Sequence, residues 1–144
     1  PTAAWGTSLY RAFELYRRCG CSTVACTCES PSFEAEAFGN IPRLDCVPWV
    51  DASATLSEDE TEVTVALVNR HPADEAEVRL SFSEEVTGVQ QATLSGADVN
   101  SANSEAKPGA VSIAIEQLGA EGESLRVAIP AHSACVCSVR RSTI

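Results

Sequence analysis

Apolar and polar residues alternate along most of the chain after Gly20, and this alternation restricts the fold more than any other feature. It is sharpest at residues 63–67, 76–82 and 125–129. Because successive side chains of a strand point to opposite faces, each run predicts a half-buried β-strand. Less regular stretches are also expected to form strands, at residues 21–29, 50–56, 87–95, 111–116 and 134–140.

Stretches that are polar or contain Gly or Pro separate these runs and predict turns at residues 57–60, 71–74, 119–122 and 130–133. Residues 96–109 lack periodicity and are expected to form one long connection. About eight short strands without helices between them indicate a mainly β fold, a two-sheet antiparallel β-sandwich of jelly-roll type. The 144 residues, 44% of them apolar, suffice for one core.

The only helical period lies at residues 8–19, where Leu9, Ala12, Phe13 and Tyr16 share one stripe. We expect this stripe to face the core of the protein. Thr7 or Ser8 can cap the start of the helix, and Gly20 can end it in the left-handed conformation. The predicted fold therefore has one short N-terminal α-helix before the strands.

The chain carries a formal net charge of −10, with acidic residues clustered between the apolar runs. This charge repels nucleic acids and anionic membrane surfaces, so neither is expected as a partner. No apolar run is long enough to span a bilayer. Methionine is absent from the sequence, and we therefore expect the chain to be a piece of a longer protein.

Seven cysteines cannot all pair within one chain, which favours a reducing environment. Three pairs of cysteines are two residues apart, at positions 19 and 21, 26 and 28, and 135 and 137. Zinc ribbons and fingers usually have two residues between paired cysteines, whereas each pair here has one. We expect free cysteines that pack as small apolar residues, and a thiol-rich metal-binding domain remains an alternative.

Residues that commonly perform catalysis are few. His71 and His132 lie at predicted strand ends, where imidazole usually bonds to loop backbone, so we expect both to be structural, although a Cys/His hydrolase stays possible. Asp45, Asp51 and Asp98 lie among apolar or small residues and could be partly buried, and none is assigned a catalytic role. No motif for phosphate, calcium or zinc binding occurs, and we expect no cofactor.

Sugars often bind by stacking on aromatic rings, which makes Trp49, Phe33 and Phe38 candidates. Trp49 is the one candidate ligand contact, for a sugar. It follows Pro48 in an apolar strand start, so packing against a neighbouring domain is the expected role and sugar binding is the alternative. A carbohydrate-binding module is therefore a second functional hypothesis.

Several segments resemble family 51 α-L-arabinofuranosidases and occur in the same order along the chain. FELYRR at 13–18 with Gly20 resembles the closing helix of the catalytic barrel, and ESPSF at 29–33 resembles the end of the next strand. IP at 41–42, DASATL at 51–56 and LVNRH at 67–71 resemble the approach to the C-terminal sandwich and one of its strands. LSGADVNSANS at 94–104 resembles a long connection, and PAHS at 130–133 the entry to the last strand.

The sequence departs from the family pattern at Ser104, usually threonine, and in an extra segment at 44–49. Cysteines also replace several of the expected aliphatic residues. In the family the acid/base and the nucleophile are glutamates upstream of everything present here, so neither role falls on a residue of this chain. The resemblance implies that residues 1–20 are a remnant of the final barrel helix and that residues 21–144 form the C-terminal β-sandwich domain.

The resemblance also implies a function. The parent enzyme would be a retaining exo-hydrolase that releases terminal L-arabinofuranose from arabinan or arabinoxylan fragments, usually as a cytoplasmic homo-oligomer. We expect this chain to be its non-catalytic structural domain, inactive alone, with the catalytic barrel and other subunits as partners. A residual hydrolase activity is the remaining alternative.

Overall fold

A computed structural model describes residues 4–142, with the backbone alone at 120 and 121. It confirms the expected fold class, a mainly β, sandwich-like protein with antiparallel sheets and one short helix. The elements are α1 (Ser8–Tyr16), β1 (Ser22–Val24), β2 (Ser32–Ala35), β3 (Leu44–Pro48), β4 (Val50–Leu56), β5 (Glu62–Asn69), β6 (Ala76–Gly96), β7 (Val111–Ile129) and β8 (Ser133–Arg141).

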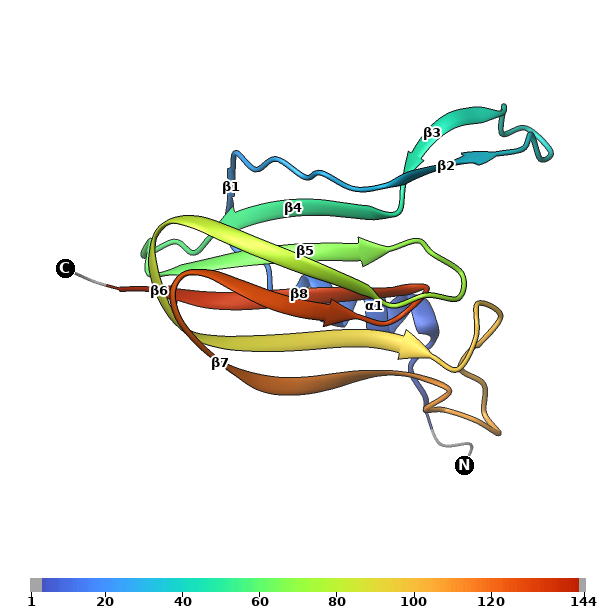
Figure 1. The fold of residues 1–144 in the computed structure, drawn as a ribbon. Coiled ribbons are helices and arrows are strands. Elements are labelled where there is room, and N and C mark those ends of the chain that lie inside the picture. The colour runs from blue at the N-terminus through green and yellow to red at the C-terminus, as the bar shows by residue number, and fades with distance from the viewer. Residues whose placement is uncertain (1–3, 143–144) are drawn as a thin grey trace.

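The main sheet has six strands in the order β1-β4-β5-β8-β6-β7, and its second layer is made by the long strands β6 and β7 (Figure 1). Residues 86–94 of β6 pair with β8, whereas residues 76–81 pair with residues 124–129 of β7. Residues 76–81 of β6 and 124–129 of β7 fold over the main sheet, and the core lies between the two layers. The largest core side chains come from both, including Leu67 and Val139 on one side and Val127 and Ile129 on the other.

The predicted turn at residues 119–122 is wrong, because β7 continues through these residues. β6 is also one continuous strand, whereas the sequence predicted two separate strands at residues 76–82 and 87–95. The pairing register shifts between Ser81 and Val86 and again between Thr87 and Val89. Gly88 and Gly122 have φ of 58° and 108°, values that residues with a Cβ rarely adopt. Such irregularities bend a strand without ending it. The glycines therefore mark the bend between layers.

A second, two-stranded sheet was not predicted. β2 and β3 form a hairpin that projects from one end of the main sheet (Figure 1), and β3 lies in the extra segment at 44–49. The predicted strand at 21–29 is shorter than expected, since only β1 pairs with β4. The hairpin tip carries Phe38, whose exposed fraction is 82%.

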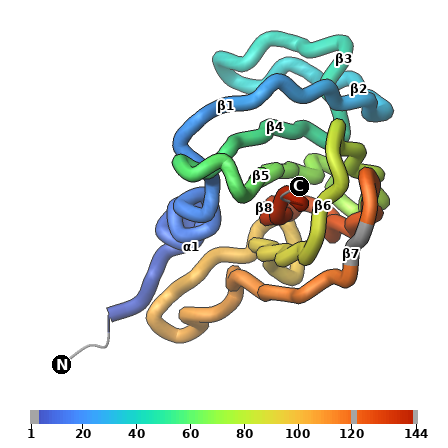
Figure 2. Tube along the Cα trace, turned by 90° about the vertical axis from the view of Figure 1, so that its left-hand side faces the viewer, coloured from blue at the N-terminus to red at the C-terminus, as the bar shows by residue number. Residues whose placement is uncertain are grey.

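α1 packs on the outer face of the main sheet, on the side opposite the second layer (Figure 2). Leu15 is fully buried there against Ala66, Ala92 and Val136. The Thr7 hydroxyl accepts a hydrogen bond from the Tyr10 amide at 3.1 Å, as the capping prediction requires. Asn103 also joins the helix to the domain, because its side-chain amide donates to the Gly6 carbonyl and its backbone amide to the Ser8 hydroxyl.

The predicted orientation of the helix is wrong. Leu9, Phe13 and Tyr16 were expected to face the core, but their exposed fractions are 67%, 66% and 43%. Together with Tyr10 they form the outer helix face. The helix also ends at Tyr16 instead of residue 19.

Gly20 does not take the predicted left-handed conformation. It is needed for another reason, because a Cβ there would lie 2.2 Å from the Leu56 carbonyl oxygen.

Candidate functional site

The three aspartates singled out from the sequence lie apart and are all exposed, so the expectation of partial burial is wrong. Asp51 bonds to Arg70 at 2.6 Å, and Asp45 to Arg43 at 3.0 Å. Asp98 accepts a hydrogen bond from the Asn100 amide at 2.7 Å, which caps a turn. Each carboxylate has a local structural partner, and the three do not form a site.

Glycoside hydrolysis needs two carboxyl groups about 5–9.5 Å apart in a concave site, one of them held protonated. A protonated carboxyl group needs a raised pKa, but the pKa values of Glu84 and Asp59 are lowered. Hydrogen bonds and charge from Arg141 lower the pKa of Glu84, and hydrogen bonds from Ser57 and Thr61 lower the pKa of Asp59. Both groups therefore favour the ionised form, which cannot act as a general acid.

The two histidines bond to loop backbone, as expected. The His71 Nδ1 accepts a hydrogen bond from the Asp74 amide at 2.7 Å. The His132 ring contacts the carbonyl oxygens of Pro72 and Gly96 at 3.2 and 3.4 Å. Neither ring is hydrogen-bonded to a Ser or Cys side chain among the described residues, so the structure offers no activated nucleophile there.

The candidate aromatic residues do not form a platform. Trp49 is half-buried between β3 and β4, and its ring packs against His71 with centroids 4.0 Å apart. Its indole Nε1 is buried and has no hydrogen-bond partner among the described residues. Phe33 lies in the β2–β3 hairpin opposite Val47, and Phe38 lies at the exposed tip of the same hairpin.

The seven thiols are free, and they differ in burial. Cys135 and Cys137 share the inner face of β8 and are buried, as expected for small apolar residues. The hydrogen bond to Cys137, together with burial, raises the pKa of Cys135. Cys26 and Cys28 are exposed and point their sulfurs at the β4 carbonyl oxygens of Ala52 and Val50. Among the side chains that the structure describes, no three of His, Cys, Asp or Glu gather as a metal site.

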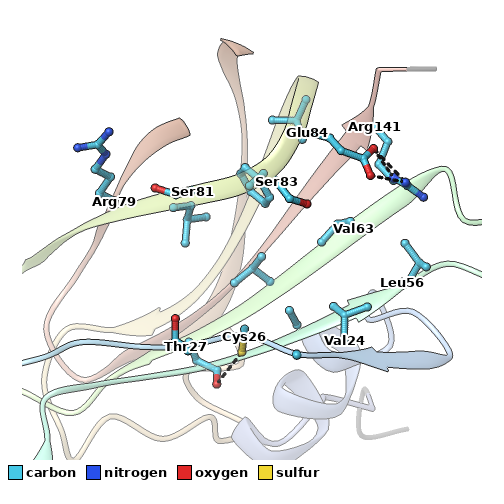
Figure 3. A pocket seen from close by; sticks show the side chains of 17 residues that line it. Val24, Cys26, Thr27, Leu56, Val63, Arg79, Ser81, Ser83, Glu84 and Arg141 are labelled. Atoms are coloured by element: carbon cyan, nitrogen blue, oxygen red, sulfur yellow. Dashed lines mark hydrogen bonds and ion pairs between the residues drawn. The ribbon is translucent and has the colours of Figure 1, made fainter. Parts of the chain in front are cut away.

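A groove of about 560 Å³ lies between the two layers (Figure 3). β6 forms one wall and the main sheet forms the floor. Glu84 and Arg141 close one end through a bidentate ion pair with a shortest distance of 2.7 Å. The floor is apolar, with Val24, Ala52, Ala54, Leu56, Val63 and Val65.

Sequence reasoning missed the groove, because its walls come from strands far apart in the chain. Glu84 and Arg141 are separated by 57 positions, and no local pattern relates them. The arrangement suits packing against another surface, since the floor is apolar and the described residues bring no catalytic groups to it. The groove and the outer helix face are thus the two candidate contact surfaces.

No helix within residues 4–142 is both long and apolar enough to cross a membrane. Comparison with curated proteins finds no match. Among solved structures, the chain resembles the family 51 α-L-arabinofuranosidase of Thermotoga petrophila RKU-1, with 28% identity and a TM-score of 0.84. An arabinose complex of the enzyme from Thermotoga maritima gives 28% and 0.85, and the enzyme from Xanthomonas axonopodis pv. citri gives 25% and 0.74.

The matches cover 93% of this chain, and this chain spans 29%, 29% and 26% of those enzymes. It is therefore less than a third as long as the enzymes that it resembles. Residues 1–133 match the family model described as the α-L-arabinofuranosidase C-terminal domain. The resemblance seen in the sequence motifs is confirmed over nearly the whole chain, and the chain belongs to the α-L-arabinofuranosidase C-terminal domain family.

Proposed function

We propose that this chain is the non-catalytic C-terminal part of an α-L-arabinofuranosidase, and that its outer helix face docks on the catalytic barrel. In this proposal, residues 1–20 contain the final helix of the barrel and residues 21–144 form the sandwich domain that braces it. The observation that carries the proposal is the exposure of Leu9, Phe13 and Tyr16 on a helix whose opposite side is already buried.

The energetics support a covered helix. Burying one large apolar side chain contributes roughly 1.5–3 kcal/mol, and the outer helix face presents four such side chains to solvent. Trp5, which precedes the helix in the sequence, is a further exposed apolar side chain, with an exposed fraction of 40%. Contiguous apolar surface of this kind marks an interaction site in soluble proteins.

The chemistry of the parent enzyme would lie elsewhere in its chain. Asp45, Asp51 and Asp98 are exposed and have local structural partners, and the pKa values of Glu84 and Asp59 are lowered, whereas a general acid needs a raised one. The solved relatives are named as α-L-arabinofuranosidases, and one of them is described as an arabinose complex. We therefore infer hydrolysis of terminal L-arabinofuranosyl groups by the parent, with arabinose-containing oligosaccharides as substrates and a homo-oligomeric assembly.

A cytoplasmic location is part of the same proposal. The seven cysteines are all unpaired, and four of them are exposed. Exposed thiols persist where the surroundings are reducing.

The first test compares activity on a chromogenic arabinofuranoside. We expect hydrolysis by the parent enzyme and none by the 144-residue chain purified free of the parent. Hydrolysis by the isolated chain would show that residues of this chain perform the reaction, contrary to the proposal.

The second test examines docking with the variant Phe13→Asp. In the parent enzyme the carboxylate would be buried at the interface, so we expect the thermal midpoint to fall. In the isolated chain the same change replaces an exposed ring and should reduce aggregation. Phe38→Asp is the matched control, since Phe38 is also exposed but lies on the hairpin. An unchanged midpoint for Phe13→Asp in the parent would contradict docking through this face.

A further inference from the structure

Residues 25–30 follow the free edge of β4 without pairing to it through their backbone. β1 pairs with β4 in a register that, if it continued, would place Cys26 opposite Ala52. Cys28 would lie opposite Val50 in the same register. However, no backbone–backbone hydrogen bond joins residues 25–30 to any other residue that the structure describes. The strand pairing therefore stops after β1, although the chain stays beside β4.

Side chains make the contacts that the backbone would otherwise make. The Cys26 Sγ lies 3.8 Å from the Ala52 carbonyl oxygen (Figure 3), and the Cys28 Sγ lies 3.5 Å from the Val50 carbonyl oxygen. A thiol at such a distance donates a weak hydrogen bond. The Ser30 hydroxyl accepts a hydrogen bond from the Val50 amide at 2.9 Å. Two of these three bonds depend on the proton of a thiol.

Both cysteines are exposed, so reagents in solution can reach them. The thiolate is the reactive form of a cysteine. Burial, followed by the charges of Asp51 and Cys26, raises the pKa of Cys28 and so lowers its thiolate fraction. Its sulfur also lies closer to a carbonyl oxygen than that of Cys26 does. Cys26 is therefore the thiol of this pair that should react first.

The two sulfurs are not arranged to bond to each other. Val50 and Ala52 are two residues apart on one strand, so their carbonyl oxygens are separated by about 6.7 Å. A disulfide bond is about 2.05 Å long. Since each sulfur lies beside its own carbonyl oxygen, an internal disulfide would require the segment to leave β4 first. The oxidised partner of Cys26 must therefore come from solution.

We propose that Cys26 is a site of reversible modification by small disulfides, such as glutathione disulfide, and that this modification releases residues 25–30 from β4. The Cys26 thiolate attacks one sulfur of the small disulfide. A new S–S bond forms to that half, the original S–S bond breaks, and the other half leaves as a thiolate that takes up the proton lost by Cys26. The Cys26 sulfur is oxidised and the leaving half is reduced. This inference does not depend on the proposed function.

The modified side chain can no longer hold the segment. It has no S–H to donate to the Ala52 carbonyl oxygen, and a bulky group at the sulfur does not fit between the segment and β4. Residues 25–30 also connect β1 to the β2–β3 hairpin (Figure 1). When the segment moves away, the Val50 amide should lose its bond to the Ser30 hydroxyl. The exchange rate of this amide therefore reports the release.

The first experiment treats the 144-residue chain with glutathione disulfide in a background of Cys21→Ser and Cys46→Ser. Cys26 and Cys28 are then the only exposed thiols. Mass spectrometry should find one glutathione, attached to Cys26 and removed by dithiothreitol. Hydrogen–deuterium exchange of the Val50 amide should become at least about threefold faster. Residues 65–67, paired on both sides, are the internal control and should keep their exchange rates.

The second experiment compares Cys26→Ala with Cys26→Ser in the same background, without any disulfide reagent. Cys26→Ala removes the donor, so it should reproduce the release, and alkylation of Cys28 should become at least about threefold faster. Cys26→Ser is the matched control, because its hydroxyl can still donate to the Ala52 carbonyl oxygen. It should leave the alkylation rate of Cys28 unchanged.

Four outcomes would overturn the proposal. One is attachment of glutathione to Cys28 but not to Cys26, and another is unchanged exchange of the Val50 amide in the modified protein. Equal alkylation rates of Cys28 in the Ala and Ser variants would show that the Cys26 hydrogen bond does not hold the segment. A product two hydrogens lighter, without glutathione, would show that the sulfurs of Cys26 and Cys28 meet in an internal disulfide.

Discussion

The indole ring of Trp49 packs against the imidazole of His71, with centroids 4.0 Å apart and planes inclined by 42°. This contact covers part of a ring that would have to be open for a sugar to stack on it. The Trp49 backbone also joins two neighbouring segments, through bonds to the Pro31 carbonyl and the Arg70 amide. Both observations favour a packing role for Trp49 over the alternative of a sugar contact.

We therefore expect no change in Trp49 fluorescence when the chain is titrated with arabino-oligosaccharides. The measurement uses Trp5→Phe, so that Trp49 is the only emitting tryptophan. His71→Ala in this background should shift the emission, because it uncovers the ring, and so verifies that the signal responds to its surroundings. A saturable change that Trp49→Phe abolishes would instead support a carbohydrate-binding module.

The Asn69 side chain holds together the end of β5 and two loops. Its amide donates to the carbonyls of Asp74, Ile129 and Pro130 at 2.9–3.1 Å, and its Oδ1 accepts from the His71 amide at 3.0 Å. The residue has an exposed fraction of 1%. We expect Asn69→Ala to lower the free energy of unfolding by about 1–3 kcal/mol, because it leaves buried carbonyls without a donor.

Urea unfolding measures this loss. Asn100→Ala is the control, since Asn100 is exposed in the long connection and only its backbone amide is bonded. Equal stability of the two variants would contradict the role given to Asn69.

The strands of the main sheet were predictable because each buries one face. β4 matches its predicted bounds, and β5 and β8 extend one or two residues beyond theirs. In these strands apolar residues on the inner face alternate with residues on the other face, and the hydrophobic effect selects the same face along the whole strand. The local sequence therefore contains most of the information that determines where these strands begin and end.

The missed features depend on contacts between distant segments. The bends of β6 and β7 keep their pairing across Gly88 and Gly122, where sequence alone indicates a turn at 119–122. The hairpin of β2 and β3 has little burial and so leaves no alternation to read. The helix was oriented wrongly because its most apolar stripe does not face its own sheet, as expected if another body covers it.

The candidate site was predictable only in part. Local patterns placed both histidines at strand ends and indicated that the aspartates have no catalytic role. The groove could not be predicted, since it exists only after β6 folds across the main sheet. Its lining residues are ordinary members of alternating strands.

The ion pair of Glu84 with Arg141 should make stability depend on pH. Hydrogen bonds and charge from Arg141 lower the pKa of Glu84 from 4.5. A carboxyl whose pKa is lower in the folded state stabilises the fold above its unfolded pKa, and this contribution is lost as the pH falls through the folded pKa. We expect the stability difference between wild type and Glu84→Gln to be larger at neutral pH than at low pH.

Urea unfolding midpoints across this range measure the effect. Because both side chains are near the surface, salt should weaken it. Glu75→Gln is the control, since Glu75 is exposed and forms no ion pair with the described residues. A difference that is constant with pH would contradict the pairing.

The thiols should react in an order set by burial. Cys21, Cys26, Cys28 and Cys46 are exposed, whereas Cys135 and Cys137 are buried. Since the thiolate is the nucleophile, Cys28 should react more slowly than Cys26, because burial, Asp51 and Cys26 raise its pKa. Timed alkylation with mass spectrometry gives the order, and denatured protein is the control in which all seven should react. Protection of the exposed thiols together with stoichiometric bound zinc would support the metal-binding alternative.

Gly20 is the point where the chain passes from α1 to β1, and the structure gives it a role different from the predicted helix cap. A Cβ at this position would lie 2.2 Å from the Leu56 carbonyl oxygen and 2.8 Å from the Ser57 amide nitrogen, so the backbone would have to move. We expect Gly20→Ala to reduce the free energy of unfolding by about 1–3 kcal/mol, as overpacking does elsewhere. Gly119→Ala is the matched control, because a Cβ there meets nothing within 4 Å and its φ is not positive. That change should leave stability unchanged or raise it by up to about 1 kcal/mol, by restricting the unfolded chain. Equal effects of the two substitutions in urea unfolding would show that the Gly20 backbone does not approach Leu56 as closely as the structure places it.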